Sequence, residues 1–119
     1  MQGSMSSRST KLLPTDLLRG TLELLILKTL AKEQMHGWGI AQSIEKISRN
    51  QLQVGQGSLY PALQRLERDG CLQATWGFSD NNRRAKYYTL SRKGKKQLEL
   101  ELKNWSRLTT AITQILEKS

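Results

Sequence analysis

The chain has 119 residues, with 19 Lys and Arg against 10 Asp and Glu, which gives a net charge of +9 at pH 7. One histidine, one cysteine, no glycine-rich phosphate loop and no motif of paired carboxylates argue against an enzyme, a cofactor or a metal site. Since no apolar run reaches the roughly 18 residues of a membrane span and one cysteine forms no intrachain disulfide, we expect a one-domain cytoplasmic protein without membrane contact.

The first 14 residues are expected to be a disordered arm. Met1–Met5 has the composition of a cloning remnant ahead of a second start, and no apolar segment typical of a signal peptide follows it. Arg8 and Lys11 could reach phosphate groups from this arm.

Two helices are expected between residues 17 and 48. Residues 17–31 contain eight Leu and Ile, an apolar surface too wide for a helix packed on one side, so this helix belongs at the centre of the core or against a partner chain. Thr15 or Asp16 should cap it. The second helix begins near Gly37–Gly39, with His36 as a capping or surface residue. Its side chains expected to point inward are Trp38, Ile40, Ile44 and Ile47.

Residues 57–70 predict a short helix with two unlike faces. Ser58 is a good N-cap, Pro61 then falls in the first turn, and Gly70 is typical of the position just past a helix end. One face carries an apolar stripe that suits packing on a core. The stripe consists of Leu59, Leu63 and Leu66.

The other face of this helix carries hydrogen-bonding groups and a ring, without an acid. Its central row is Tyr60, Gln64 and Arg68, and Ser58 and Arg65 flank it. A helix of this kind can lie in the major groove of DNA. An ordinary surface helix, whose polar face only keeps it soluble, is the alternative.

The residues after Gly70 predict a β-hairpin with a basic tip. Residues 72–76 alternate as in a strand, Ser79–Asn82 is prone to turns, and residues 86–90 are rich in strand formers. Cys71 is expected to pack as a small apolar residue where the first strand begins. The cations between the strands are Arg83, Arg84 and Lys86. A helix followed by such a hairpin is the order of a winged helix-turn-helix, in which the hairpin is the wing.

The positive charge is concentrated in one segment. Residues 79–96 hold seven Lys and Arg against one Asp, which is six of the nine excess charges. If Ser91 caps the last helix, four cations over residues 92–96 crowd the positive end of its dipole, which costs roughly a few tenths of a kcal/mol each. A bound phosphate would reverse that effect. The pattern indicates a surface for a polyanion, with a solvated basic face as the alternative.

The last helix, roughly Ser91–Lys118, carries a long apolar stripe. At 1.5 Å per residue it would be about 40 Å long, more than a domain of this size can cover. We therefore expect a homodimer that presents two recognition helices to a pseudo-palindromic operator. The expected interface residues are Leu98, Leu102, Trp105, Ile112 and Leu116.

These segments together resemble the PadR family of bacterial transcriptional regulators. The resemblance is carried by Leu17–Glu23, His36–Ile40, Gly57–Gly70 and Arg84–Gly94, which follow one another in the family's order. The single C-terminal helix is similar to that of the short-tailed subgroup. The resemblance implies a homodimeric winged-helix repressor that leaves its operator when a small effector binds.

Members of that subgroup include multidrug sensors that hold flat aromatic drugs between paired tryptophans at the dimer interface. Trp105 occupies a position that resembles theirs, and with Leu108 it is the expected effector site; ordinary packing in the dimer core is the alternative. Trp38 stands where Tyr is more usual and Ser91 where Thr is common, which leaves the effector open.

The expected DNA contacts fall into two groups. Tyr60 and Gln64 face the groove, where Gln64 suits adenine, and Ser58 donates to a phosphate or a base. The second group contacts phosphates or the minor groove. It consists of Arg65, Arg68, Arg83, Arg84, Lys86 and Lys93.

The expected architecture is mainly α with a small β-hairpin. It comprises the arm over residues 1–14, a winged helix-turn-helix over 15–90 and a dimerisation helix over 91–119. The expected function is a homodimeric, nucleoid-associated DNA-binding repressor, released by a planar aromatic molecule. The alternative is a basic RNA-binding or ribosome-associated module, a monomer that stacks single strands on exposed aromatics. The seven aromatic residues are expected mostly at inward positions, which disfavours that alternative.

Overall fold

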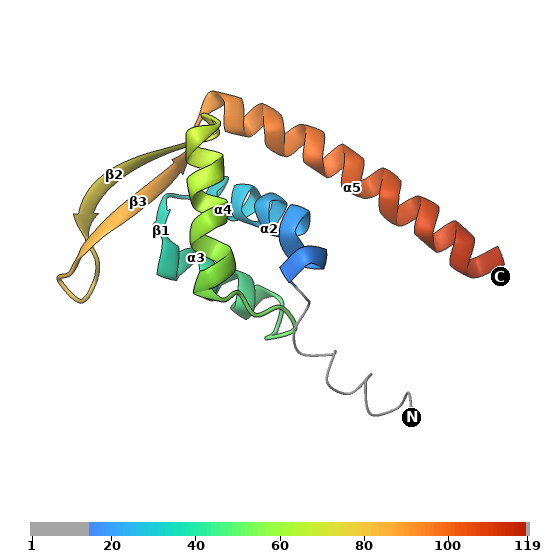
Figure 1. Ribbon diagram of the computed structural model, residues 1–119, viewed down its shortest axis with the longest axis horizontal. Helices are drawn as coiled ribbons and strands as arrows, with labels where there is room; N and C mark the ends of the chain where they lie inside the picture. The colour runs from blue at the N-terminus through green and yellow to red at the C-terminus, as the bar shows by residue number, and fades with distance from the viewer. Residues whose placement is uncertain (1–14, 119) are drawn as a thin grey trace.

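The computed structural model describes residues 15–118, and side chains from residue 20 onward (Figure 1). The predicted arm over residues 1–14, including Arg8 and Lys11, lies outside the described residues, as do the side chains of Thr15 and Asp16. Along residues 15–118 no helix is both long enough and apolar enough to cross a membrane. The elements in chain order are α2 (Thr15–Leu30), β1 (Met35–His36), α3 (Gly37–Ile47), α4 (Gln56–Arg68), β2 (Leu72–Phe78), β3 (Arg84–Leu90) and α5 (Arg92–Lys118).

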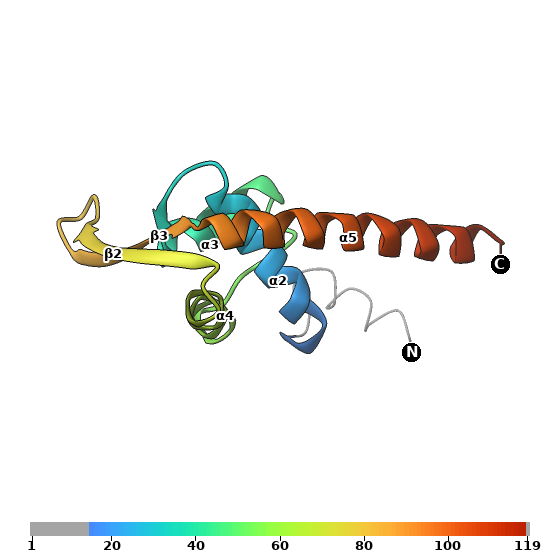
Figure 2. The same ribbon diagram turned by 90° about the horizontal axis from the view of Figure 1, so that it is seen from above.

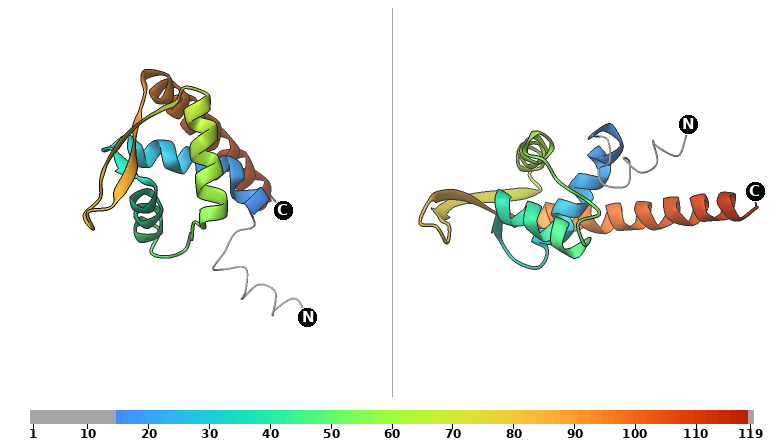
Figure 3. Two further views of the ribbon diagram at one scale, coloured as in Figure 1. Left: turned by 60° about the vertical axis from the view of Figure 1, so that its left-hand side comes forward. Right: turned by 90° about the horizontal axis from the view of Figure 1, so that it is seen from below.

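The core is built around α2. This helix contacts α3, α4, α5 and β3, and it passes behind α4 in the left-hand view of Figure 3. Leu22, Ile26 and Leu27 are almost fully buried, which confirms the central position that the width of the apolar surface predicts. The start of α5 and the base of the hairpin close the core from the other side.

Helix α3 agrees with the sequence prediction in part. Ile40 and Ile44 are buried, but Trp38 and Ile47 are 61% and 67% exposed, so the inward placement of these two residues is wrong. Trp38 lies two positions before Ile40, which is the opposite side of a helix, and Ile47 is the last residue of α3, past the edge of the core. His36 caps α3, since its Nδ1 accepts a hydrogen bond from the Gly39 N–H at 2.9 Å.

Helix α4 has its N-cap three residues earlier than predicted. The carbonyl of Gly55 accepts from the N–H groups of Ser58 and Leu59, so Gly55 is the N-cap, Ser58 lies within the first turn, and Pro61 lies inside the helix. The predicted N-cap at Ser58 is therefore wrong. The leucine stripe is buried as predicted. Gly70 follows the helix with φ +81°, the left-handed conformation that glycine adopts without strain.

The sheet has three antiparallel strands in the order β1-β3-β2. The predicted hairpin is confirmed, and its strands are longer than expected because Phe78 and Arg84 still pair. Strand β1 is not predicted from the sequence, because its two residues, which pair with Tyr88 and Tyr87, are too few to show alternation. Ser79–Arg83 forms the connecting turn.

Helix α5 and the hairpin project from opposite sides of the core (Figure 2). Ser91 caps α5 as predicted, because its Oγ accepts from the Gly94 N–H at 3.0 Å. Beyond Leu98, the large apolar side chains of the stripe are exposed. Cys71 is buried where β2 begins, and burial is the main cause that raises the pKa of its thiol.

Candidate nucleic-acid interface

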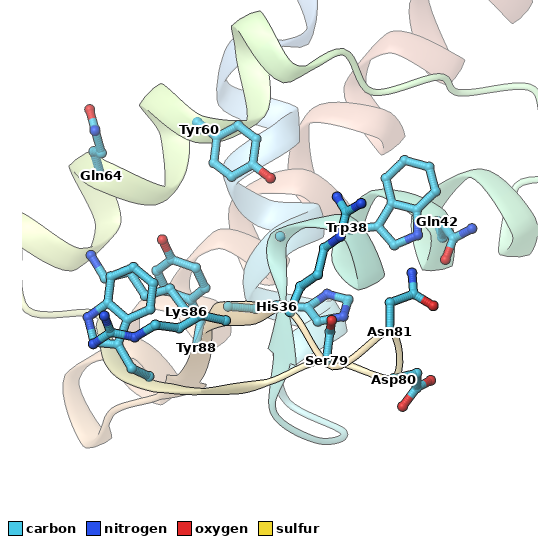
Figure 4. A pocket seen from close by; sticks show the side chains of 15 residues that line it. His36, Trp38, Gln42, Tyr60, Gln64, Ser79, Asp80, Asn81, Lys86 and Tyr88 are labelled. Atoms are coloured by element: carbon cyan, nitrogen blue, oxygen red, sulfur yellow. The ribbon is translucent and has the colours of Figure 1, made fainter.

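A cavity of about 870 Å³ separates the wing, which is the hairpin of β2 and β3, from helices α3 and α4 (Figure 4). Tyr60 and Gln64 border it from α4, and Trp38 and Gln42 border it from α3. The wing side is basic, because Arg83–Lys86 lines it. The cavity thus joins the polar face of α4 to the cationic wing.

Tyr60 is held in place by the start of α3. Its ring points from α4 toward the cavity (Figure 4), and Gln64, one turn later, also lines this cavity. A Cβ on Gly37 would lie 2.9 Å from Cε1 of Tyr60, so the ring packs where Gly37 has no side chain. Tyr60 and Gln64 are both exposed, and Ser58 is half-buried in the first turn of α4. The predicted outer row of α4 is therefore open to solvent.

Arg65 does not belong to that row. Its Nε donates to Oε2 of Glu23 on α2 at 2.8 Å, and both side chains are largely covered. Arg65 follows Gln64 by one position, or about 100° around the helix, which turns it toward α2. The structure therefore gives Arg65 a partner inside the protein, and its predicted phosphate contact stays a prediction. Arg68 is exposed, 3.7 Å from the carboxylate of Asp69.

Lys86 is likewise held within the protein. Its Nζ donates to Oε1 of Glu67 on α4 at 3.0 Å, and this hydrogen bond is the main cause that raises the pKa of Lys86. The ammonium group also lies 5.8 Å from the centre of the Tyr88 ring. Lys86 thus links the wing to α4, and its predicted contact with the DNA backbone or minor groove stays a prediction.

Lys93 occupies the C-terminal end of α4. Its Nζ donates to the carbonyl oxygen of Asp69 at 2.6 Å, at the end of a helix where the dipole favours a cation. Lys93 is nevertheless exposed, and its predicted phosphate contact stays a prediction. Exposed cations near the cavity and the start of α5 are Arg68, Arg83, Arg84, Arg92, Lys93, Lys95 and Lys96.

The prediction that most aromatic residues lie at inward positions is wrong. Five of the seven are exposed, among them Trp38 and Trp76, which line the cavity. Trp76 continues the alternation that buries Leu72, but the hairpin extends past the core. The guanidinium carbon of Arg84 lies 4.6 Å from the centre of the Trp76 ring. The exposure of Trp76 could have been predicted from the sequence, because the hairpin is long relative to the short helices that form the core.

The second predicted site lies on α5. Trp105 and Leu108 line a cavity of about 240 Å³ together with Leu24 and other residues of α2. Leu98, predicted as an interface residue, is buried in the chain's own core, so that assignment needs correction. The other predicted interface positions are exposed, namely Leu102, Trp105, Ile112 and Leu116. Among the described residues no cluster of three or more His, Cys, Asp or Glu could hold a metal ion.

Known proteins are similar to this chain in sequence and in fold. The model of the Transcriptional regulator PadR-like family matches residues 26–100. A PadR-like transcriptional regulator of Bacillus cereus is 29% identical, with 85% of this chain and 96% of that chain covered and a TM-score of 0.72. A PadR family transcriptional regulator of Eggerthella lenta is 28% identical, with 87% of this chain and 88% of that chain covered and a TM-score of 0.74. A protein of Streptococcus mutans is 33% identical, with 83% of this chain and 89% of that chain covered and a TM-score of 0.74.

Proposed function

The chain belongs to the PadR-like family of transcriptional regulators, and from this membership we propose that it is a homodimeric repressor of a pseudo-palindromic DNA operator. Members of this family are DNA-binding regulators and not enzymes. In this proposal the winged helix-turn-helix over residues 15–90 binds DNA and the helix over 91–119 joins two copies. As a DNA-binding regulator it would work on the chromosome, in the cytoplasm and at the nucleoid.

One observation carries the proposal: Tyr60 and Gln64 of α4 line the same cavity as the exposed wing cations Arg83 and Arg84. A recognition helix in the major groove places such a wing beside the adjacent backbone or minor groove. We assign base contacts to Tyr60 and Gln64, and a contact near the start of α4 to Ser58. The cations assigned to the backbone are Arg68, Arg83 and Arg84.

Arg65, Lys86 and Lys93 take a different part in this proposal. Each is engaged with a group of the protein, so we assign them to positioning: Arg65 holds α4 against α2, and Lys86 holds the wing against α4. Lys93 holds the start of α5 against the end of α4.

Two substitutions separate base contacts from backbone contacts. Gln64→Ala should reduce the preference for the operator over a random duplex by about tenfold, because a lost bidentate contact costs about 1–3 kcal/mol of discrimination. Arg84→Ala should weaken binding to both duplexes and reduce the salt slope by about one unit. Fluorescence anisotropy titrations at several salt concentrations measure both effects, on a duplex that the protein selects from a random pool.

Arg107→Ala is the matched control for Arg84→Ala. Arg107 is exposed on the last helix, far along the chain from the wing, and its removal should leave both affinities close to those of the parent. If Gln64→Ala and Arg84→Ala also bound both duplexes as the parent does, the assignment of this face to DNA would be wrong.

We further propose that a planar aromatic molecule binds near Trp105 and Leu108 and releases the operator. These two side chains border the cavity against α2, and a second copy would bring another Trp105 to the same interface. Offset stacking on the rings would add roughly 0.5–1.5 kcal/mol beyond the burial of area. Packing of Trp105 in the dimer core alone is the competing explanation.

Tryptophan fluorescence tests this effector site. In a Trp38→Phe, Trp76→Phe background, the emission comes from Trp105 alone. Flat aromatic compounds should quench it in a saturable manner and lower the affinity for the selected duplex. A panel of chemically diverse compounds without any saturable response would count against the effector site, while DNA binding by the same variant would show that it is folded.

The exposed aromatics bear on the RNA-binding alternative, since Trp38 and Trp76 offer the stacking surfaces that such a module uses. Family membership favours duplex DNA. Competition resolves the two: an excess of single-stranded RNA should not displace a selected DNA duplex from the proposed repressor, whereas it would displace it from a single-strand-binding module.

A further inference from the structure

The wing carries two large aromatic side chains that the fold leaves in solvent. Trp76 is 59% exposed and Phe78 is 69% exposed. Alternation along β2 places both on the face that buries Leu72 nearer the core. Since the hairpin extends past the core, the described residues do not cover this end of the face. Two adjacent exposed rings are unusual at such a position and indicate a partner.

The two rings have different surroundings. The guanidinium group of Arg84 lies over Trp76, which covers part of that ring and fixes the stack. Phe78 pairs with Arg84 between the two strands of the hairpin, and its ring is more exposed than that of Trp76. It is also the last residue of β2, next to the turn at the tip. Phe78 is therefore the ring at the leading end of the wing.

The charge around the rings identifies the partner. Arg83 and Arg84 are exposed beside them, and residues 79–96 carry most of the excess positive charge of the chain. A partner with an anionic outside and apolar surface within reach of a ring fits this combination. The minor groove of DNA offers both, with phosphates along its edges and base steps at its floor. A protein partner would need an acidic patch around an apolar pocket.

We propose that Phe78 is a wedge that enters the minor groove beside the α4 contact and partly unstacks one base step. The Trp76–Arg84 stack then lies against the neighbouring sugar and phosphate. Side chains that act in this way kink the duplex by about 20–90°, and pyrimidine–purine steps deform most easily. The inference rests on the proposed DNA-binding function and adds to it a bend and a preference for a flexible step under the wing.

Energy transfer between dyes at the two ends of the selected duplex measures the bend. The parent protein should shorten the end-to-end distance. Phe78→Ala should restore most of that distance and lower the affinity about tenfold, as expected when one stacking contact is lost. Phe78→Leu, which keeps an apolar wedge, should retain most of the bend. Ile47→Ala is the matched control, because Ile47 is nearly as exposed as Phe78 and lies at the end of α3, not on the wing.

A second signal reports the unstacked step directly. With 2-aminopurine placed in turn at the steps flanking the α4 site, the parent should raise the fluorescence at one step, and Phe78→Ala should not. Since Phe78 is exposed, its removal leaves the core intact, and thermal melting verifies this.

The results distinguish a failure of the proposed wedge from a failure of the proposed DNA-binding function. If the parent binds the duplex and Phe78→Ala gives the same bend and the same 2-aminopurine signal, the wedge is wrong and the proposed function stands. If Phe78→Ala lowers the affinity without changing the bend, the wedge is also wrong, because Phe78 would then only contact the surface of the duplex. If the parent binds no duplex at all, the proposed function fails and the inference with it.

Discussion

Replacing Leu108 and Ile112 with lysine is expected to give a folded monomer whose affinity for the selected duplex is at least about 100-fold lower. Both side chains are exposed on the projecting part of α5, on the stripe proposed to join two copies. Two lysines from each copy would place four like charges at a two-fold interface without partners. A monomer has one recognition helix, so it loses the second half-site and the gain of about 10²–10⁴ from linked binding.

Light scattering after gel filtration measures the mass, and circular dichroism verifies the helix content. The matched control is Thr110→Lys with Gln114→Lys, which adds the same charge to the opposite side of α5, where both residues are exposed. The control should remain a dimer and bind at least as tightly as the parent, because it gains positive charge. A dimer formed equally by the two double variants would show that the stripe is not the interface.

Gly94→Ala is expected to destabilise the protein by about 3 kcal/mol, at the upper end for overpacking. A Cβ at this position would lie 2.2 Å from the carbonyl oxygen of Cys71 and 2.8 Å from Cδ1 of Leu90. The carbonyl oxygen of Cys71 is a backbone atom and cannot rotate out of the way as a side chain could. The start of α5 must therefore shift away from the end of α4.

The surrounding hydrogen bonds oppose such a shift. The Ser91 hydroxyl donates to the Gly70 carbonyl at 2.6 Å, and the Ser91 N–H donates to the Cys71 carbonyl at 3.0 Å. Both bonds hold α5 against the residues that follow α4. Movement here would change the angle between the proposed dimerisation helix and the proposed recognition helix, so we expect DNA affinity to fall along with stability.

Urea unfolding at one fixed protein concentration measures the effect, since the stability of a dimer depends on concentration. Gly57→Ala is the control, because an added Cβ there meets no atom within 4 Å and alanine favours a helix over glycine by roughly 0.5–1 kcal/mol. Its stability should be equal to or slightly above that of the parent. An equal stability of Gly94→Ala and Gly57→Ala would contradict the close packing at the junction.

Most elements of the fold could be predicted from local pattern. The leucines of α4 recur at helical spacing, and the α5 stripe is longer than a domain of this size can cover. Pattern failed where an element was too short or extended past its neighbours. Strand β1 has two residues and shows no period, and Ile47 and Trp76 continue apolar patterns beyond the edge of the core. Periodicity predicts the face of the helix or strand on which a side chain lies, but it does not predict whether another part of the protein covers that face.

The candidate site shows the same division. Residue type and charge distribution are enough to predict that α4 and the wing form a surface for a polyanion, because helix period and cation density are properties of the chain alone. Which cations are free was decided by tertiary neighbours, since Glu23 is 42 positions before Arg65 and Glu67 is 19 before Lys86. Ion pairs between distant segments form only when the fold brings them within a few ångströms, and no local pattern records that distance.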